Sequence, residues 1–345
     1  MSVSADTSTR MFVEARDSGP AVARMLAANG AAIETLAERL RALPPRMIVT
    51  CARGSSDHAA TFGKYLFETL LHVPVISAAP STASVFAAPA GGGPDTLFIA
   101  ISQSGRSPDL LATVEAYRTA GAQIVALVND EASPLAAASD VVVRLSAGPE
   151  RSVAATKSCI AAMAALLALA AAVSGDTTIR AAVEALPLCL RDAFEQDWGA
   201  MVDRLAGAHN LFVVGRGYGL GIAQEMALKL KETCALHAEA FSAAEVRHGP
   251  MTIVGAGFPI LAIAGSDAAG RSVTTVAEEF AARGANVLLA DPAAAGGDLP
   301  ASAAHPAIEP ILMLQSFYRA ANALSLRRGL NPDAPPHLAK VTQTV

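Results

Sequence analysis

The sequence predicts an α/β protein made of two similar domains, each with a parallel sheet covered by helices on both faces. Between residues 47 and 145, short runs rich in Val and Ile alternate with helix-like stretches, which is the pattern of βαβ units. The pattern then starts again. Arg53-Gly54 returns as Arg216-Gly217, and Gly121-Ala122 returns as Gly284-Ala285, both at an offset of 163 residues. A constant offset between such landmarks indicates an internal duplication.

The elements of the first half follow one another at short intervals. Apolar residues at helical spacing cover residues 12–43, and this helix ends at Pro44-Pro45 because proline cannot continue it. We expect strands at 47–51, 74–77, 97–101, 123–128 and 141–145, and helices at 56–71, 109–120 and 134–138.

The chain of 345 residues has room for two domains of ordinary size. The predicted organisation has five parts: an N-terminal helical segment (1–45), a first domain (46–175), a helical connector (176–205), a second domain (206–330) and a C-terminal tail (331–345).

Composition excludes several classes of protein. A net charge of -5 gives no reason to expect binding to nucleic acid or to an anionic membrane surface. The four cysteines are scattered without CxxC spacing, which fits a reducing cytosol and argues against structural zinc. The polar residues 1–10 lack the apolar core of a signal peptide. The longest uncharged apolar run, 159–173, is shorter than the roughly 20 residues that span a bilayer. We therefore expect a cytoplasmic protein in which that run is a buried helix.

The stretch Ser102-Gln103-Ser104-Gly105-Arg106-Ser107-Pro108 carries the strongest functional signal. It directly follows the apolar strand 97–101 and opens a helix, for which Pro108 suits the first turn. Unpaired N–H groups and the positive dipole end of a helix bind anions, and hydroxyl groups add donors. The stretch therefore predicts a phosphate site. The alternative is an ordinary serine N-cap, which needs only one hydroxyl.

A second stretch of this kind, Gly54-Ser55-Ser56, follows the first strand of the same half. Parallel sheets bind ligands beyond the carboxyl ends of their strands, so we expect both stretches to converge. The second half has Ala264-Gly265-Ser266-Asp267 at the corresponding place, where the aspartate would repel a phosphate. We therefore expect the first half to hold the ligand and the second to supply ionisable groups.

A weaker signal follows the last strand of the first half, at Val153-Ala154 and Lys157. Lys157 fits a surface or capping role equally well.

The ionisable candidates lie in the second half and in the tail. Glu225, Lys229 and Glu232 are spaced i, i+4 and i+7 and share one helix face, which either lines a site or forms an exposed Glu–Lys ladder. His248 stands before Gly-Pro in a turn, where an imidazole serves as acid or base or is merely structural. Lys340, in a stiff apolar tail, is either a nucleophilic amine or a surface lysine.

A metal site has only weak support. His237 and Glu239 could form a pair, but no third ligand has suitable spacing. We assign neither a metal nor a cofactor to the chain.

Taken together, the motifs resemble the double sugar-isomerase (SIS) domain family, over about residues 47–342. The chain is similar to the isomerase half of glucosamine-6-phosphate synthases and, in the strings 53–59, 102–109 and 126–131, to stand-alone SIS-type glucosamine-6-phosphate deaminases. The resemblance implies two flavodoxin-like α/β/α domains. The motifs that carry it are Gly54-Ser55-Ser56, Ser102-Gln103-Ser104-Gly105 with Ser107, Val153-Ala154, Lys229-Leu230-Lys231-Glu232, His248-Gly249-Pro250 and Leu338-Ala339-Lys340.

The resemblance also implies roles for these residues. Glu232 would move the proton between C1 and C2 of a phosphosugar, with Lys229 and Glu225 near it. His248 would open the sugar ring from the neighbouring subunit of a homodimer, and Lys340 would form a Schiff base with the open-chain ketose. The implied phosphate ligands are Ser55, Ser102, Gln103, Ser104 and Ser107, and Gly54, Ser56, Val153, Ala154 and Ala339 complete the substrate-binding set.

One departure from the synthases matters for the predicted reaction. A synthase begins with a glutaminase domain, whereas here the first SIS domain is reached within about 45 residues. We therefore expect the reverse proton transfer, in which glucosamine 6-phosphate and water give fructose 6-phosphate and ammonia. The alternatives with the same fold are a fructosamine-6-phosphate deglycase, a galactosamine-6-phosphate deaminase and an aldose–ketose isomerase. A non-catalytic sugar-phosphate sensor would need only the phosphate site.

Overall fold

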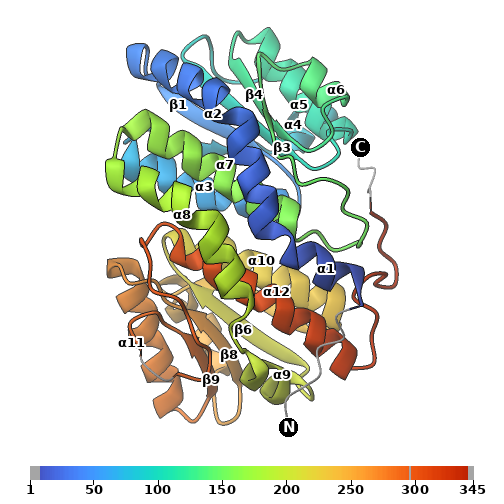
Figure 1. Cartoon of the computed structure of the whole chain (residues 1–345), viewed down its shortest axis with the longest axis vertical. Coiled ribbons are helices and arrows are strands. Elements are labelled where there is room, and N and C mark those ends of the chain that lie inside the picture. Colours follow the sequence, from blue (N-terminus) through green and yellow to red (C-terminus); the bar gives the residue numbers. More distant parts are fainter. Residues whose placement is uncertain (1–7, 295–296, 341–345) are drawn as a thin grey trace. The chain divides into compact units, whose positions relative to one another are not determined.

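The structure is a computed structural model that describes residues 8–294 and 297–340 (Figure 1). It divides into two compact units. The C-terminal unit consists of the described residues up to Gly19 together with Glu150–Lys157 and Ala185–Lys340, and the N-terminal unit consists of Pro20–Pro149 and Ser158–Glu184. The units are therefore interleaved along the chain, and the five predicted segments stay a prediction. Parts of the predicted terminal segments, 1–7 and 341–345, lie outside the described residues.

A five-stranded parallel sheet forms the centre of the N-terminal unit. Its strand order is β2-β1-β3-β4-β5. The strands are β1 (Met47–Cys51), β2 (Val75–Ser77), β3 (Thr96–Ser102), β4 (Gln123–Val128) and β5 (Val141–Arg144). Each lies within one or two residues of its predicted position, because a short Val/Ile-rich run between turn signals is typical of a strand. The central strands β1, β3 and β4 are mostly buried, whereas the edge strands β2 and β5 are partly exposed.

Helices cover both faces of this sheet, as predicted. One face packs through Val49, Phe98 and Ile124 against α5 (Pro108–Thr119) and α6 (Pro134–Ala137). The other face carries α3 (Ser55–Leu70), and α7 (Lys157–Ser174) lies beside α3 (Figure 1). A short helix, α4 (Pro80–Ser84), lies next to α5.

Helix α7 contains the long apolar run. It is long and apolar enough to cross a membrane by length and composition, with a mean hydropathy of 1.9. However, 89% of it is buried inside the described structure, which is the pattern of a core helix. The expectation of a buried helix is therefore confirmed, and the cytoplasmic location stays a prediction.

The C-terminal unit has a four-stranded parallel sheet in the order β7-β6-β8-β9. Its strands are β6 (Asn210–Gly215), β7 (His237–Ser242), β8 (Pro259–Ile263) and β9 (Asn286–Ala290). Helix α11 (Ala268–Ala282) packs on β6, β8 and β9, while α10 (Tyr218–Cys234) lies against β6, β7 and α12 (Glu309–Arg327). The remaining elements are α1 (Arg10–Arg16), α9 (Gly199–Leu205) and the 3-10 turns η1 (Glu245–Arg247) and η2 (Pro250–Ile253).

In the described structure, three helices contribute residues to both units. These are α2 (Ser18–Ala42), α8 (Thr177–Phe194) and α7, whose first residue, Lys157, belongs to the C-terminal unit. The single helix expected over residues 12–43 is wrong in one respect, since α1 and α2 are separate helices divided at Asp17. The Asp17 carboxylate lies 3.1 Å from Lys157 Nζ, a tertiary contact that helical spacing does not reveal.

The two sheets bear out the internal duplication. Both place their strands in the same spatial order, apart from β5, which has no counterpart in the second sheet. The agreement extends to backbone angles. Gly54 has φ 56° and ψ -130°, and its counterpart Gly217 has φ 57° and ψ -129°. A left-handed φ favours glycine, so both copies keep Gly at the turn between the first strand and its helix.

Candidate functional site

The first group of predicted site residues lies at one end of the N-terminal sheet. Strands β1 and β3 are neighbours, and the helices that follow them, α3 and α5, lie on opposite faces. The strand order therefore reverses direction between β1 and β3. In open parallel sheets, such a point is where ligands bind, beyond the carboxyl ends of the strands. We call the residues at this point, 54–56 and 102–107, the phosphate site, because the sequence predicts that they bind a phosphate.

The turn Gly54-Ser55-Ser56 forms one wall of the phosphate site. Gly54 is exposed and precedes the first turn of α3, where Ser55 and Ser56 are half-buried. The thiol of Cys159 on α7 donates to the Ser55 carbonyl at 3.4 Å, which ties this turn to the core. The two serine side chains are thus placed on a well-anchored turn rather than on a loose loop.

The segment after β3 forms the other wall. Ser102 Oγ accepts the Gly105 N–H at 3.0 Å, and Gly105 has a φ of 63°. A Cβ at Gly105 would lie 2.4 Å from Ser133 Oγ, so only glycine fits this turn. Gln103, Ser104 and Ser107 are half-buried. The Ser107 hydroxyl makes no capping hydrogen bond although Ser107 is the N-cap of α5, so the ordinary-cap alternative does not describe it.

The arginines beside the phosphate site are already paired with carboxylates. Arg53 Nε donates to Asp109 at 3.0 Å, and Arg106 Nη2 donates to Asp130 at 2.7 Å. The hydrogen bond from Arg106 is the main cause that lowers the pKa of Asp130. A ligand at this site would therefore meet hydroxyl and backbone N–H donors more than unpaired cationic side chains. This is consistent with the chain's net charge of -5.

Burial raises the pKa of two titratable groups near the phosphate site. Burial raises the pKa of the Cys51 thiol to about 12, which makes this thiol unreactive at neutral pH. Burial also raises the pKa of Asp57, in the first turn of α3, against the opposing effects of His58 and Arg53.

The second group of predicted site residues lies on α10 of the C-terminal unit. The side chains of Glu225 and Lys229 are 0% and 1% exposed, and Lys229 Nζ lies 3.6 Å from Glu225 Oε1. Lys229 also forms an ion pair with Glu232, one turn further on. From α12, Tyr318 donates its hydroxyl to Glu225 Oε1 at 3.0 Å. The alternative of an exposed Glu–Lys ladder is therefore wrong.

Glu232 is the member of this row that solvent reaches. Its side chain is 21% exposed, and it lies in the last turn of α10, which ends at Cys234 with Ala235 in a left-handed conformation. The Lys229 ammonium orients the Glu232 carboxylate from the buried side. A carboxylate that is fixed on one side and open on the other is suited to accept and return a proton.

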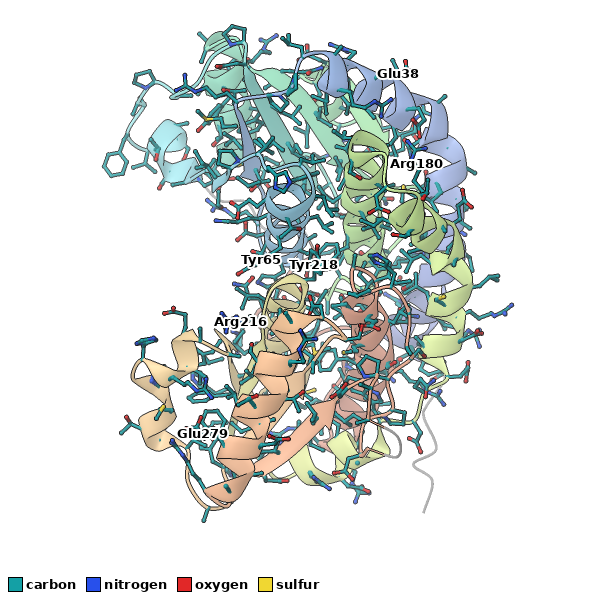
Figure 2. The ribbon with its side chains drawn as sticks, turned by 90° about the vertical axis from the view of Figure 1, so that its left-hand side faces the viewer. Glu38, Tyr65, Arg180, Arg216, Tyr218 and Glu279 are labelled. Carbon is teal, nitrogen blue, oxygen red and sulfur yellow. The ribbon has the colours of Figure 1, made fainter. Side chains whose placement is uncertain are left out.

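His248 lies elsewhere on the C-terminal unit. It is exposed and follows η1, which is held by two hydrogen bonds from Arg247 to Glu279 Oε2, at 3.1 and 2.9 Å. Glu279 lies on α11 (Figure 2). Among the described residues, no hydrogen bond or ion pair joins His248 to Glu232.

The last predicted residues lie on two further segments of the C-terminal unit. Val153 is half-buried, Ala154 is buried and Ala339 is exposed. Lys340 Nζ donates to Glu150 Oε2 at 3.3 Å, and its side chain is 25% exposed. Lys340 is thus held by a buried carboxylate that sequence reasoning had not singled out.

Metal binding finds no support in the described part of the chain. No group of three His, Cys, Asp or Glu side chains there lies close enough together to hold an ion. His237 and Glu239 are both exposed on β7.

Comparison with known proteins gives the family. The SIS domain family matches residues 44–172 and 204–290, which is more than half of the chain and falls on the two sheets in turn. The chain belongs to the SIS domain family. The resemblance found in the sequence motifs is therefore confirmed.

The curated relatives of this SIS-domain chain include glutamine–fructose-6-phosphate aminotransferases (isomerizing). The protein from Aeropyrum pernix is 33% identical in an alignment of 319 residues that covers 86% of this chain and 50% of the relative. The protein from Sulfolobus acidocaldarius is 35% identical in an alignment of 303 residues that covers 85% of this chain and 49% of the relative. The chain spans about half the length of the curated relatives it matches.

Solved structures agree with this assignment. A phosphosugar-isomerase candidate from Silicibacter pomeroyi is 40% identical, with a TM-score of 0.89, covering 94% of this chain and 100% of that one. A glucosamine-6-phosphate deaminase from Thermotoga maritima has a TM-score of 0.77 at 22% identity, covering 97% of this chain and 100% of that one. At that identity the likeness shows the fold. The predicted α/β fold with two SIS domains is therefore confirmed.

Proposed function

We propose that this chain is an amino-sugar phosphate deaminase that converts glucosamine 6-phosphate and water to fructose 6-phosphate and ammonia. The observation that carries the proposal is the row Glu225, Lys229 and Glu232 on α10. Burying two charged groups is costly unless they pair with each other, as Glu225 and Lys229 do. Lys229 also pairs with Glu232 and so fixes this third, solvent-accessible carboxylate. Such an arrangement is what a proton transfer between neighbouring carbon atoms requires.

The phosphate site supports a phosphorylated sugar as the substrate. Hydroxyl and N–H donors at the starts of α3 and α5 suit a phosphate group, with Ser55, Ser102 and Ser104 among its ligands. Binding the phosphate supplies energy that is independent of the reacting carbon atoms. That energy can be used to orient C1 and C2 toward the proton-transferring group.

The chemistry can be written with every proton accounted for. His248 moves a proton from the C1 hydroxyl to the ring oxygen, which opens the ring to an aldehyde with an amine at C2. Glu232 takes the proton from C2 and returns it to C1, while the nitrogen gives up one proton and the aldehyde oxygen gains one and becomes a hydroxyl. The double bond is then between C2 and nitrogen. The oxygen of water then replaces this nitrogen, so that ammonia is released and fructose 6-phosphate remains.

Lys340 and the partner subunit complete the proposal. Lys340 would take part in this replacement. Its ammonium first gives up a proton, the amine attacks C2 and ammonia leaves. Water then hydrolyses the resulting Schiff base with the open-chain ketose, which frees the Lys340 amine. We also propose that the chain is a homodimer in which His248 acts in the site of the neighbouring copy. Its exposed position after η1, without a contact to Glu232 of its own chain, supports this arrangement.

The test is incubation of the purified protein with glucosamine 6-phosphate in the absence of glutamine. We expect ammonia and fructose 6-phosphate to appear in equal amounts. A Glu232→Gln preparation, purified in the same way, controls for contaminating enzymes. Galactosamine 6-phosphate tests the configuration at C4, and a fructosamine 6-phosphate tests the deglycase alternative.

Each outcome decides between functions. Product from glucosamine 6-phosphate that the Glu232→Gln preparation does not form establishes the deaminase. Turnover of only the galactosamine or fructosamine compound would replace the proposed substrate but keep the reaction class. Interconversion of an aldose and a ketose phosphate without ammonia would make the chain a simple isomerase. Binding of the sugar phosphates without any turnover would favour a sensor.

A further inference from the structure

A buried carboxylate, Glu150, lies beside Lys340 in the C-terminal unit. The Glu150 side chain is fully buried. Its Oε1 accepts the backbone N–H of Thr156 at 3.0 Å, and its Oε2 accepts from Lys340 Nζ at 3.3 Å. The two residues are 190 positions apart in the sequence, so the contact joins the segment 150–157 to the C-terminal tail.

The segment that carries Glu150 is itself held from several sides. Glu14 on α1 accepts the backbone N–H groups of Arg151 and Ser152. The N–H of Val153 donates to the Asp333 carbonyl at 3.2 Å, so the tail is also attached directly to this segment. The Asp333 carboxylate in turn accepts N–H groups from the first turn of α1, each at 2.8 Å. These contacts make Glu150 part of a rigid frame.

Lys340, by contrast, lies on a tail without helix or strand. Residues 328–340 contain no regular element, and Ala339 beside Lys340 is exposed. A lysine side chain loses conformational freedom when it is fixed, so a specific contact has to offset that loss. The contact with Glu150 is suited to do so, because a buried carboxylate gains much from an ammonium partner.

Other charges nearby are already engaged. Lys157, at the end of the same segment, lies 3.1 Å from Asp17. Glu14 is engaged by backbone N–H groups. Lys340 is therefore the cation whose position the Glu150 carboxylate most directly controls.

We propose that Glu150 is the positioning residue for Lys340, holding its ammonium at one place and orientation until substrate arrives. The part of this inference that concerns catalysis rests on the proposed function, in which the Lys340 amine reacts with the sugar. The contact itself does not. Glu150 does not touch substrate in this scheme and acts only through Lys340.

The first experiment measures the contact without any substrate. Brief treatment of the folded protein with acetic anhydride acetylates free amines, and peptide mass spectrometry reports the rate at each lysine. We expect Glu150→Gln to raise the rate at Lys340 about fivefold or more, because the Lys340 nitrogen is then no longer held against a buried carboxylate and is freer to meet the reagent. Lys64, which lies 3.9 Å from Glu68 on α3, serves as the reference lysine and should keep its rate.

The outcome is clear in either direction. An unchanged acetylation rate at Lys340, with Lys64 also unchanged, would overturn the proposal. If Glu150→Gln lowers the yield of folded protein, Glu150→Asp replaces it. Asp keeps the charge but is one methylene shorter, so a smaller rise at Lys340 is expected, and no rise would count against the inference.

The second experiment asks whether Glu150 acts only through Lys340. The variants Glu150→Gln, Lys340→Met and the double variant are compared for kcat and KM. We expect Glu150→Gln to lower kcat about tenfold in the natural chain and to have no further effect once Lys340 is Met. An equal loss in both backgrounds would mean a general structural role and would overturn the proposal.

The two experiments separate the inference from the proposed function. A protein that shows no turnover of any amino-sugar phosphate would contradict the proposed function. The acetylation result would still decide whether Glu150 holds Lys340. If Lys340→Met is fully active while Glu150→Gln raises acetylation, the contact exists but the role assigned to Lys340 in the reaction is wrong.

Discussion

Glu309 accepts the backbone N–H of Ser266 at 2.7 Å, at the place in the C-terminal unit that corresponds to Gln103 in the phosphate site. The other Glu309 oxygen accepts the N–H of Ala304 at 3.1 Å. Asp267 caps α11 by accepting the Gly270 N–H. The second copy thus satisfies its backbone donors with carboxylates of its own chain. That only the first copy binds phosphate stays a prediction.

Glu232→Gln should abolish turnover and leave sugar-phosphate affinity nearly unchanged, because the amide cannot accept the C2 proton but occupies the same volume. We expect kcat to fall by about 10²–10⁴-fold. Steady-state kinetics and calorimetric binding of the sugar phosphate measure the two effects. Glu278→Gln, an exposed change on α11, is the matched control. Full activity in Glu232→Gln would refute the assignment of the proton transfer.

Two inactive variants should complement each other if His248 acts in the neighbouring subunit. Glu232→Gln and His248→Ala are mixed under conditions that allow subunits to exchange. Each mixed dimer then has one site with both natural residues, so about a quarter of the natural activity should return. No recovery in mixtures with proven exchange would place both residues in the site of one chain.

Ser104→Ala should raise KM about fivefold with little change in kcat, because one hydrogen bond to the phosphate contributes about 1 kcal/mol in the ground and transition states alike. Initial-rate kinetics separate the two constants. Ser139→Ala, whose hydroxyl donates to the Leu135 carbonyl on α6, is the control outside the phosphate site. A large loss of kcat at constant KM would argue against Ser104 as a phosphate ligand.

Gly105→Ala should destabilise the fold. The backbone φ is 63°, which costs an L-residue about 1–2 kcal/mol, and the new Cβ would collide with Ser133, which adds about 1–3 kcal/mol. Urea unfolding measures the loss. Gly91→Ala is the control because its Cβ would meet nothing within 4 Å, and its effect should stay within about 0.5 kcal/mol. Equal stability of both variants would contradict the geometry described for Gly105.

Glu14 should make the stability of the protein depend on pH. Burial raises the pKa of Glu14 above its ordinary value of 4.5, against the lowering effect of the N–H groups of Arg151 and Ser152. Below pH 4.5 the group is protonated in both states. As pH rises above 4.5, the unfolded chain releases the proton first, so folding stability falls until Glu14 also ionises in the folded protein.

Glu14→Gln removes this contribution. We expect the stability of the natural chain relative to Glu14→Gln to decrease as pH rises above 4.5 and then to level off. Urea unfolding across this pH range measures the difference, and the exposed change Glu278→Gln should show none of it. A difference that grows with pH would mean that the N–H contacts outweigh burial.

The positions of the strands and of most helices were predictable from the sequence because the signals are local. A Val/Ile-rich run, a proline at a helix start and a glycine at a turn each determine the structure of only the few residues around them. The N-terminal helix shows the limit of this reasoning. Helical spacing continues across Asp17, but the structure divides the segment into α1 and α2 there, where Asp17 meets Lys157.

The candidate site was predictable to a similar degree. Spacing placed Glu225, Lys229 and Glu232 on one helix face, but it left open whether that face was exposed. Burial decides this, and burial depends on α12, whose Tyr318 lies 93 residues away from Glu225. Sequence patterns give no sign of such a partner, because nothing in the local spacing of either helix refers to the other.

By itself, the sequence determined the α/β fold, its duplication and the residue types gathered at each strand end, because these follow from periodicity and turn chemistry. The resemblance of its motifs indicated the SIS family. Tertiary structure alone decided which side chains are buried, that Glu309 satisfies the second copy's donors, and that Glu150 holds Lys340. These contacts join residues far apart in the chain. They arise only when packing brings the segments together and removes water from the charges between them.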